Sequence, residues 1–307
     1  PSFTQNWLSN NKNKIAQLIV QAREVNKFHG TFLSSIMKYQ VNGRIHGEIQ
    51  QLRSDSGGTV SGRLSMSNPN LQQVPARNKD FGPKIRSLFI PEEGYKWGSF
   101  DYSQQEPRMT VHYAASIGDG YEGSNELVEA YHNTEADFHQ TVADLVGIER
   151  SQAKTIGLGL MYGMGKNKLA LSLGVSKDEA DKLIVKYNNK VPFVKKLSDR
   201  CKFAADEKGV IRTKKGRKCR FDLWETKDFG LHVAEKFDDA VAKYGKDNIK
   251  RAYTYKALNR LIQGSSADQT KQAMLDCYNQ GHLPMLQIHD ELCFNIEDDN
   301  HANKIKK

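Results

Sequence analysis

Apolar residues recur at helical spacing through the first forty residues of the chain. Many of them stand three, four or seven positions apart, which predicts a helix over residues 3–40. The residues that set this pattern are Leu8, Ile15, Leu18, Ile19, Phe28 and Phe32. Short apolar runs between turn residues then predict strands and turns over residues 41–60. Residues 61–77, a polar stretch that contains Pro69 and Pro75, predict a loop.

The rest of the chain alternates between short strand patterns and long helical ones. The stretch YKWGSFD alternates apolar and polar positions like a strand, and LQIHDELCF predicts a strand, a sharp turn and a second strand. The basic stretch at residues 208–220 predicts a hairpin or a loop, and the chain closes with a polar tail. Helices are expected over residues 103–116, 124–205 (with breaks near Gly147, Gly163 and Gly174), 231–246 and 252–280.

The two strand-rich regions lie far apart in sequence, and a helical block separates them. We therefore expect a mixed α/β fold of the α+β kind, in which one sheet is built from two distant segments and a helical lobe is inserted between them. Asp101 and Asp290 would then meet in space although 189 positions separate them. With 307 residues, the chain is long for one core and predicts two or three subdomains.

Composition narrows the class of protein. An apolar fraction of 38% and a charged fraction of 26% are typical of a soluble globular protein. No apolar stretch is long enough to cross a bilayer, and no targeting signal is recognisable, so the default compartment is the cytoplasm. The four cysteines form no CxxC pair and indicate neither a zinc site nor a disulfide framework. The net charge of +9 favours a polyanionic partner such as nucleic acid.

Carboxylates end one predicted strand and occupy the predicted hairpin tip. Asp101 is the last residue of the strand predicted in YKWGSFD. Asp290 and Glu291 lie in the turn predicted within LQIHDELCF. Mg²⁺ prefers carboxylate oxygens, and two such ions can stabilise both the attacking and the leaving oxygen in phosphoryl transfer. The simpler alternative is that Asp290 and Glu291 only form the turn.

A second cluster is predicted on one helix face. Arg150, Lys154, Leu158 and Tyr162 recur every four residues, so two cations, an apolar residue and an aromatic ring share that face. Such a face suits a triphosphate at one end and a base at the other, and His139 just before it could add a donor. An ordinary amphipathic helix with solvated cations is the alternative.

Five motifs in a fixed order resemble those of family A DNA polymerases. Three of them, DYSQQEPR (101–108), RSQAKTIGLGLMYG (150–163) and IHDE (288–291), look like the three signatures of the family. Two further blocks, SGRLSMSNPNLQQVPAR (61–77) and NRLIQGSSAD (259–268), match as well. Together the motifs span most of the chain, which makes the resemblance specific.

The resemblance implies a right-hand architecture with an antiparallel-sheet palm, a mostly helical fingers lobe and a thumb that is largely missing. The implied division is a thumb-base remnant (1–40), a first palm segment (41–115), fingers with an inserted segment (116–250) and a second palm segment (251–307). Residues 222–250 and the QQEP sequence look more like phage members of the family. Because most of a thumb and any exonuclease would precede residue 1, we expect a piece of a longer polymerase.

The resemblance also implies site residues and partners. Asp101, Asp290 and the backbone of Tyr102 would bind two Mg²⁺ ions, with Glu291 supporting them. The incoming deoxynucleoside triphosphate would meet His139, Arg150, Lys154, Leu158, Tyr162, Glu106 and Gln104. Primer–template DNA would meet Arg63, Asn259, Gln263, Arg108 and His289. We expect a monomer without a membrane partner, acting in a bacterial or phage-infected cell.

Glu106 admits two interpretations. SQQE at 103–106 is a capping-box pattern, with Ser103 as N-cap and Glu106 three residues on. By resemblance, Glu106 instead occupies the position that excludes a ribose 2′-hydroxyl, and both roles are compatible.

Three positions depart from the family pattern. Leu158 stands where an aromatic residue is common, Pro107 where Leu is common, and Tyr255 where Arg is common. We expect Leu158 to alter nucleotide selection or rate. Pro107 should be tolerated in a first helical turn. Tyr255 is expected to remove a DNA contact.

The expected activity is template-directed addition of deoxynucleotides to a primer 3′ hydroxyl, with release of pyrophosphate. A two-metal nuclease would not explain the cations near His139, and a single-subunit RNA polymerase would not explain Glu106. A non-catalytic nucleic-acid-binding module would not need the carboxylates. The basic loop RTKKGRKCR (212–220) either follows a phosphate backbone or is simply solvated.

Overall fold

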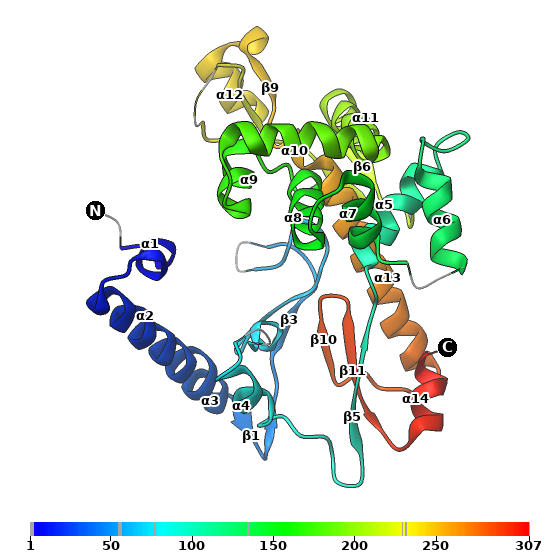
Figure 1. Cartoon of the computed structure of the whole chain (residues 1–307). Helices are drawn as coiled ribbons and strands as arrows, with labels where there is room; N and C mark the ends of the chain where they lie inside the picture. The colour runs from blue at the N-terminus through cyan, green and yellow to red at the C-terminus, as the bar shows by residue number, and fades with distance from the viewer. Residues whose placement is uncertain are drawn as a thin grey trace. The chain divides into compact units, whose positions relative to one another are not determined.

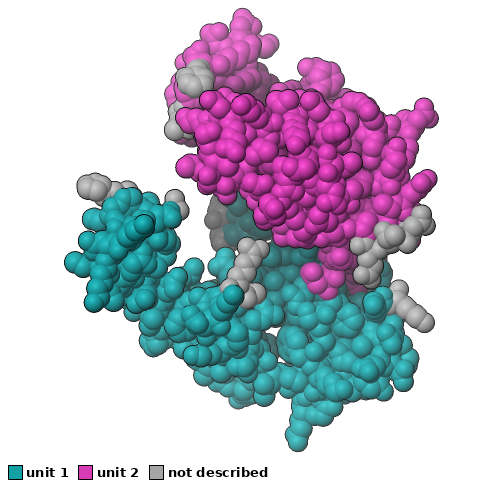
Figure 2. Space-filling model, viewed as in Figure 1, with its two compact units in different colours: residues 1–59, 64–100, 274–307 teal, residues 60–63, 101–273 magenta. Residues whose placement is uncertain are grey.

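The structure, a computed structural model, describes residues 3–54, 57–75, 78–133, 136–228, 230 and 232–306. The chain forms two compact units, each built from segments that are distant in sequence (Figure 2). Unit 1 comprises residues 1–59, 64–100 and 274–307, and unit 2 comprises residues 60–63 and 101–273. The four-part division into thumb base, palm and fingers stays a prediction.

The helical part of unit 1 lies near its N-terminus. One continuous helical stretch runs through α2, the π-helical η1 and α3 (Figure 1). The bounds in unit 1 are α1 (Gln5–Asn10), α2 (Lys14–Lys27), η1 (Phe28–Ser34), α3 (Ser35–Lys38), η2 (Leu71–Gln73), α4 (Gly82–Arg86) and α14 (Asp299–Lys306).

The predicted helix over residues 3–40 is interrupted after α1. Asn13 accepts a hydrogen bond from the Ile15 backbone nitrogen at 2.8 Å and so caps a new helix, α2. Of the apolar residues that set the helical spacing, Leu8, Phe28 and Phe32 are buried, but Ile15 is 67% and Leu18 is 53% exposed. The spacing therefore marks helix, but not every residue that sets it lies in the core.

The strands in the described part of unit 1 form three small sheets. In the largest, the order β10-β11-β5 joins two segments far apart in sequence, which confirms the predicted platform. The strand bounds are β1 (Gln40–Val41), β2 (Arg44–Ile45), β3 (Glu48–Gln50), β4 (Ser65–Ser67), β5 (Lys96–Asp101, whose last residue is grouped with unit 2), β10 (Leu286–Ile288) and β11 (Glu291–Ile296).

One sequence prediction in unit 1 needs correction. The stretch 61–77, of which residues 76 and 77 lie outside the described residues, is not only a loop, because β4 pairs with β3. The polar tail at the C-terminus forms α14 over residues 299–306. The apolar cluster beneath these elements comprises Phe28, Phe32, Ile36, Met66, Leu71 and Ile85.

Unit 2 is mostly helical (Figure 1), and its described residues include the hairpin β6-β7 and a second antiparallel pair, β8-β9. Its helices are α5 (Gln105–Ala115), α6 (Ser124–Asn133), α7 (Phe138–Val146), α8 (Arg150–Met161), α9 (Lys166–Leu173), α10 (Lys177–Lys190), α11 (Pro192–Lys208), α12 (Phe237–Tyr244), η3 (Lys246–Asn248), η4 (Thr254–Lys256) and α13 (Ala257–Asn279, which continues into unit 1). Its strands are β6 (Val210–Arg212), β7 (Lys218–Arg220), β8 (Trp224–Thr226) and β9 (Ile249–Arg251).

The helix predicted over residues 231–246 is largely wrong. Residue 231 lies outside the described residues, and only Phe237–Tyr244 is helical. Glu235 instead bridges to Trp224 through two backbone hydrogen bonds, so the segment before α12 is extended. The other predicted helices of unit 2 are confirmed. None of the helices in the described part of the chain is long and apolar enough to span a bilayer.

Local sequence explains where the helices that carry the predicted site begin and end. Asp137 caps α7 by accepting a hydrogen bond from the Gln140 backbone at 3.0 Å, and Gly147 ends the helix in the left-handed region. A capping box between Glu149 and Gln152 then starts α8 two residues later. The turn between α7 and α8 is therefore defined at both ends.

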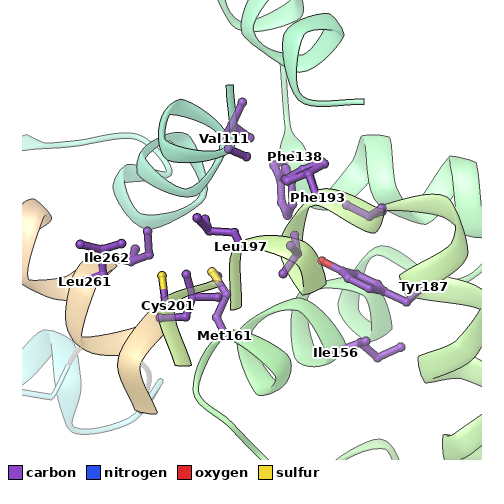
Figure 3. Packing of buried hydrophobic residues seen from close by; sticks show 14 of the residues in the cluster. Val111, Phe138, Ile156, Met161, Tyr187, Phe193, Leu197, Cys201, Leu261 and Ile262 are labelled. Atoms are coloured by element: carbon purple, nitrogen blue, oxygen red, sulfur yellow. The ribbon is translucent and has the colours of Figure 1, made fainter. Parts of the chain in front are cut away.

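The core of unit 2 packs side chains from α5, α7, α8, α10, α11 and α13 together (Figure 3). Tyr187, Phe138 and Phe193 are among its largest fully buried side chains. The hydroxyl of Tyr187 has no hydrogen-bond partner among the described residues, and burial raises its pKa well above the ordinary value.

Replacing Tyr187 by Phe is expected to stabilise the protein. The change removes a buried hydroxyl that makes no hydrogen bond, which should raise the free energy of unfolding by about 1 kcal/mol. Urea unfolding would measure it. The control is Tyr113→Phe, because the Tyr113 hydroxyl lies 2.6 Å from Ser265 Oγ, and its loss should cost about 1 kcal/mol. Equal effects of the two changes would contradict the prediction.

Candidate active site and nucleic-acid interface

The turn between β10 and β11 holds two of the predicted site residues. Ile288 pairs with Glu291 across the hairpin, so His289 and Asp290 form a two-residue turn. His289 has φ 58°, as such tight turns require. Its carbonyl accepts a hydrogen bond from Gln287 Nε2 at 2.6 Å, and Gln287 Oε1 in turn accepts one from Gln72 at 2.9 Å. These two glutamines fix the turn that presents Asp290.

Glu291 is engaged within unit 1. Ser99 Oγ on β5 donates a hydrogen bond to Glu291 Oε1, and Cys293 Sγ lies 3.5 Å from the same oxygen. This contact joins the end of β5 to the start of β11. A carboxylate held in this way is suited to support the hairpin rather than to bind a ligand itself.

Asp101 is the last residue of β5, and its side chain is exposed. Tyr102 follows it directly. Asp101 is grouped with unit 2 and Asp290 with unit 1. Among the described residues, no group of three or more His, Cys, Asp or Glu side chains is arranged to bind a metal ion.

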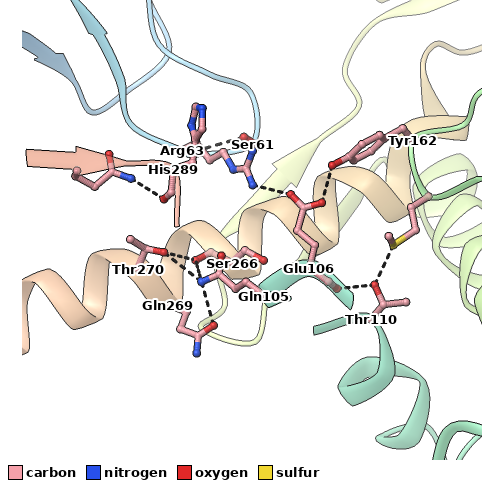
Figure 4. Close-up of polar contacts among 12 residues, drawn as sticks. Ser61, Arg63, Gln105, Glu106, Thr110, Tyr162, Ser266, Gln269, Thr270 and His289 are labelled. Atoms are coloured by element: carbon pink, nitrogen blue, oxygen red, sulfur yellow. Dashed lines mark hydrogen bonds and ion pairs between the residues drawn. The ribbon is translucent and has the colours of Figure 1, made fainter. Parts of the chain in front are cut away.

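Three predicted site residues of unit 2 meet at one carboxylate (Figure 4). Arg63 Nη2 lies 2.6 Å from Glu106 Oε1, and Tyr162 Oη donates a hydrogen bond to Glu106 Oε2 at 2.6 Å. Glu106 is only 8% exposed. Both of its carboxylate oxygens are therefore held by partners from other segments, which fixes the side chain in place.

The capping-box interpretation of Glu106 is wrong. The N-cap of α5 is Gln104, in the left-handed region at φ 53°, and it makes no side-chain cap. Glu106 is the second residue of the helix, and its carboxylate binds Arg63 and Tyr162 instead of backbone nitrogens. Pro107 is the third residue, so it lies in the first turn, where its missing N–H removes no helical hydrogen bond.

The Tyr162 hydroxyl has two hydrogen-bond partners, Glu106 and Gln263. Burial, then the charge of Glu106 and the hydrogen bond to it, raise the pKa of Tyr162 to about 12, and Gln263 also bonds to its hydroxyl. The phenol therefore stays protonated and donates to Glu106 at all ordinary pH values. Tyr162 is the C-cap of α8, so this contact ties the end of α8 to the start of α5.

Gln104 connects α5 to the start of α7. Its Oε1 accepts a hydrogen bond from the Phe138 backbone nitrogen at 2.8 Å, and its Nε2 donates to the Ala136 carbonyl at 2.9 Å. The Arg108 guanidinium lies 4.2 Å from the centre of the Tyr131 ring, and its Nε donates to the Ser103 carbonyl. Both residues therefore have structural partners within unit 2.

The predicted cationic face of α8 is present. Lys154 is exposed, and Ile156, on the opposite side of the helix, is buried. Arg150 is not simply solvated, because its Nε and Nη2 lie 2.9 and 2.5 Å from Asp137 Oδ2. Hydrogen bonds and the charge of Arg150 lower the pKa of Asp137 although burial opposes this. Leu158 packs partly against the core.

Asp137 is a residue that sequence reasoning missed. It caps α7 and pairs with Arg150, thirteen positions further along the chain. The available signal was an Asp directly before a helical pattern, in the motif DFHQ.

His139 is 5% exposed, which was not expected for a donor to a triphosphate. Its Nδ1 is buried and has no partner among the described residues. Burial, helped by Lys154 and Arg150 and opposed by Asp137, lowers its pKa to about 4. His139 is therefore neutral at pH 7 in this structure.

Acidification is expected to destabilise the protein through His139. A histidine whose pKa falls from 6.5 to about 4 on folding binds a proton more readily when unfolded, so stability is lost as pH falls from 6.5 towards 4. The loss between pH 7 and pH 5 should be at most roughly 2 kcal/mol. Urea unfolding of the wild type and His139→Gln at both values would test this, and an equal pH dependence of the two would contradict it.

A cavity of about 490 Å³ in unit 2 brings the predicted DNA-binding residues together. Its lining includes Asn259 and Gln263, which lie one turn apart on α13, together with Tyr162, Lys256 and Arg260. Tyr255 packs beside Gly163, where an added Cβ would lie 2.8 Å from its ring. The Tyr that replaces the common Arg is thus partly used in packing.

A second cavity, of about 790 Å³, lies within unit 1 beside the hairpin. Its charged and imidazole-bearing lining residues are Arg23, Lys27, Arg86 and His289, together with the carboxylates of Glu24 and Glu291. Gln72, Gln73 and Asn78 add polar groups, and Phe28 and Phe32 form part of its wall. The cavity therefore offers both cations and amides next to the residue that precedes Asp290.

Comparison with known proteins gives the class. The sequence model of DNA polymerase family A matches residues 3–307, and the chain belongs to this family. A protein of Pseudomonas phage M6 named "DNA-directed DNA polymerase" is 39% identical over 97% of this chain and 48% of its own length. DNA polymerase DpoZ of Acinetobacter phage SH-Ab 15497 is 31% identical over 97% of this chain and 49% of its own length. DNA polymerase I of Pseudomonas aeruginosa is 31% identical over 93% of this chain.

A solved structure supports the same assignment. The POL domain of Pol1 from M. smegmatis, in complex with DNA primer-template and dNTP, superposes on 100% of this chain with a TM-score of 0.75 at 26% identity. This chain covers 51% of that one and about half the length of the phage relatives.

Proposed function

We propose that this chain catalyses template-directed addition of deoxynucleotides to a primer 3′ hydroxyl, with release of pyrophosphate. The single observation that carries the proposal is the family match over residues 3–307. Two features of unit 2 support it: the Glu106 carboxylate, which binds Arg63 and Tyr162, and the cationic face of α8. The chemistry needs positioning and electrostatic stabilisation more than covalent catalysis.

Glu106 is proposed to select deoxyribose. Its carboxylate is held by Arg63 and Tyr162 and cannot turn aside to admit a 2′-hydroxyl. Gln104, two residues before Glu106, would support this site, and Leu158 would line it. This role is supported by the family pattern together with the two hydrogen bonds that hold the side chain.

The triphosphate is proposed to lie along the start of α8. Arg150 and Lys154 would bind phosphate oxygens through charge and hydrogen bonds. Arg150 would exchange Asp137 for phosphate on binding. His139 would donate to a phosphate only after α7 or α8 moves, because the side chain is buried here.

Primer–template DNA is proposed to contact both cavities. Asn259 and Gln263 would donate to minor-groove acceptors, which are nearly independent of sequence, as copying of any template requires. Arg63 and Arg108 would make further contacts with the primer–template DNA. The cations of the unit 1 cavity and His289 would follow the phosphate backbone of the primer strand.

The residues at the two strand ends fit hard divalent cations. Asp101 ends β5, Asp290 directly precedes β11, and these strands are neighbours in one sheet. We propose that their carboxylates and the Tyr102 carbonyl bind two Mg²⁺ ions, while Glu291 supports the hairpin. Mg²⁺ takes few protein ligands and completes its shell with water and phosphate, so two carboxylates suffice. When bound, such ions stabilise charge on the attacking and leaving oxygens.

Template-directed extension is the test of the proposed activity. The chain, a primed template with one of four templating bases, Mg²⁺ and each deoxynucleotide in turn should give incorporation of the complementary nucleotide. DNA shortening without nucleotides would instead identify a nuclease, and preference for ribonucleotides would identify an RNA polymerase. Binding without any reaction would support a non-catalytic binding module.

The setting of the protein is also a proposal. Its relatives come from phages and bacteria, so we propose that it acts as a monomer in the cytoplasm of a bacterial or phage-infected cell. The palm would be formed by the strand-bearing segments and the fingers by the helices from α6 to α11.

A further inference from the structure

One arginine of the basic hairpin joins three segments of unit 2. Arg217 lies in the turn between β6 and β7. Its Nε bonds to Asp268 Oδ1 at 2.7 Å, and its Nη2 donates to the carbonyls of Ser61 and Gly264 at 2.7 and 2.8 Å. The guanidinium thus connects the hairpin, α13 and the segment 60–63, which carries Arg63.

The arginine is closely packed between two glycines. A Cβ on Gly62 would lie 2.4 Å from Arg217 Nη1, and one on Gly264 would lie 2.7 Å from Nη2. Gly62 also has φ +83°, which disfavours other residues. Three hydrogen bonds hold the guanidinium, so it could not move aside without losing them.

Arg217 is also the counter-charge of a buried carboxylate. The side chain of Asp268 is 10% exposed and that of Arg217 is 31% exposed. Asp268 Oδ2 is buried and has no hydrogen-bond partner among the described residues. The ion pair to Arg217 is therefore the main compensation for burying this charge.

We propose that Arg217 is a positioning residue for nucleotide selection. By holding the Ser61 carbonyl against α13, it sets the path of the segment that brings Arg63 to within 2.6 Å of Glu106. Neither a contact with a phosphate backbone nor a solvated loop explains a guanidinium whose donors are directed at protein carbonyls and a carboxylate. The inference rests on the proposed role of Glu106 in excluding ribonucleotides.

The test compares Arg217→Gln with Arg217→Lys and with the control Lys218→Gln. Lys218 is an exposed cation on the same hairpin, so its loss matches the change in net charge. Hydrogen exchange of the backbone amides of residues 60–64 reports the position of the segment without requiring activity. The ratio of kcat/KM for a deoxynucleotide to that for the matching ribonucleotide reports selection.

Arg217→Gln is expected to speed exchange in residues 60–64 and to lower the selection ratio roughly tenfold, as for loss of one hydrogen bond to a charged group. Arg217→Lys keeps a counter-charge for Asp268 but loses the forked contact with both carbonyls, so it should fall between wild type and Arg217→Gln. Lys218→Gln should match wild type. If Arg217→Gln fails to fold, Arg217→Lys carries the same comparison.

The outcomes separate this inference from the proposed role of Glu106. Unchanged exchange and selection in Arg217→Gln overturn the inference. A relaxed selection ratio in Glu106→Ala with an unchanged ratio in Arg217→Gln also overturns it. Faster exchange in Arg217→Gln, with selection unaffected by Glu106→Ala, supports the positioning of the segment but shows that Glu106 is not the selecting group.

Discussion

Replacing Asp290 by Asn is expected to abolish primer extension, with kcat lowered on the order of 10³-fold or more while primer–template binding is kept. Asn retains the size of the side chain and the two-residue turn, which Gln287 fixes through the His289 carbonyl. What it removes is the negative charge that the proposed Mg²⁺ site needs. Single-nucleotide extension under pre-steady-state conditions would measure the change.

The matched control for this prediction is Asp299→Asn. Asp299 is an exposed carboxylate in the first turn of α14, in the same unit, and its loss should leave extension within about twofold. A titration with Mg²⁺ should show a higher requirement only in the Asp290 variant. Full activity of Asp290→Asn would show that the hairpin carboxylate is only a turn former.

Truncating Glu106 to Ala is expected to relax sugar selection by on the order of 10²-fold. The change opens the space that a 2′-hydroxyl needs, and it leaves Arg63 without its counter-charge and Tyr162 without its acceptor. The rate with deoxynucleotides should also fall, because α5 and α8 lose a shared contact. Competition between matched deoxy- and ribonucleotides would give the ratio.

Two further variants separate shape from charge at this site. Glu106→Gln keeps the bulk of the side chain, so selection should stay close to that of the wild type if exclusion is steric. Tyr162→Phe removes one hydrogen bond and leaves the carboxylate beside Arg63, so it should loosen selection only in part. Selection that is equal in the wild type and Glu106→Ala would rule out the proposed role.

Sequence could predict the elements that carry the site but not the contacts between them. The period of α8 and the turn at Asp290 are local patterns, and the structure confirms both. The partners of Glu106 stand 43 and 56 positions away, and Asp268 stands 51 from Arg217. Such pairs depend on how distant segments pack, and no local spacing reveals them.

Other errors had local causes that a pattern search cannot weigh. Two asparagines ended the first helix at a point where apolar spacing continued, and side-chain capping prevailed over periodicity. The burial of His139 was also not expected, because the pattern gave only its place before α8, whereas α7 buries it together with Val142 and Ala143. In both cases the structure was decided by interactions with neighbouring residues that the apolar pattern did not include.

In the proposed triphosphate site, the ion pair of Asp137 with Arg150 would compete with the ligand. The Arg150 side chain is 46% exposed, so the pair contributes at most about 1 kcal/mol and a multiply charged ligand can displace it. A weak anion such as inorganic phosphate cannot do so as readily. Under the same proposal, Asp137 would regain Arg150 when pyrophosphate leaves. One carboxylate would then both discourage unproductive occupancy and assist turnover.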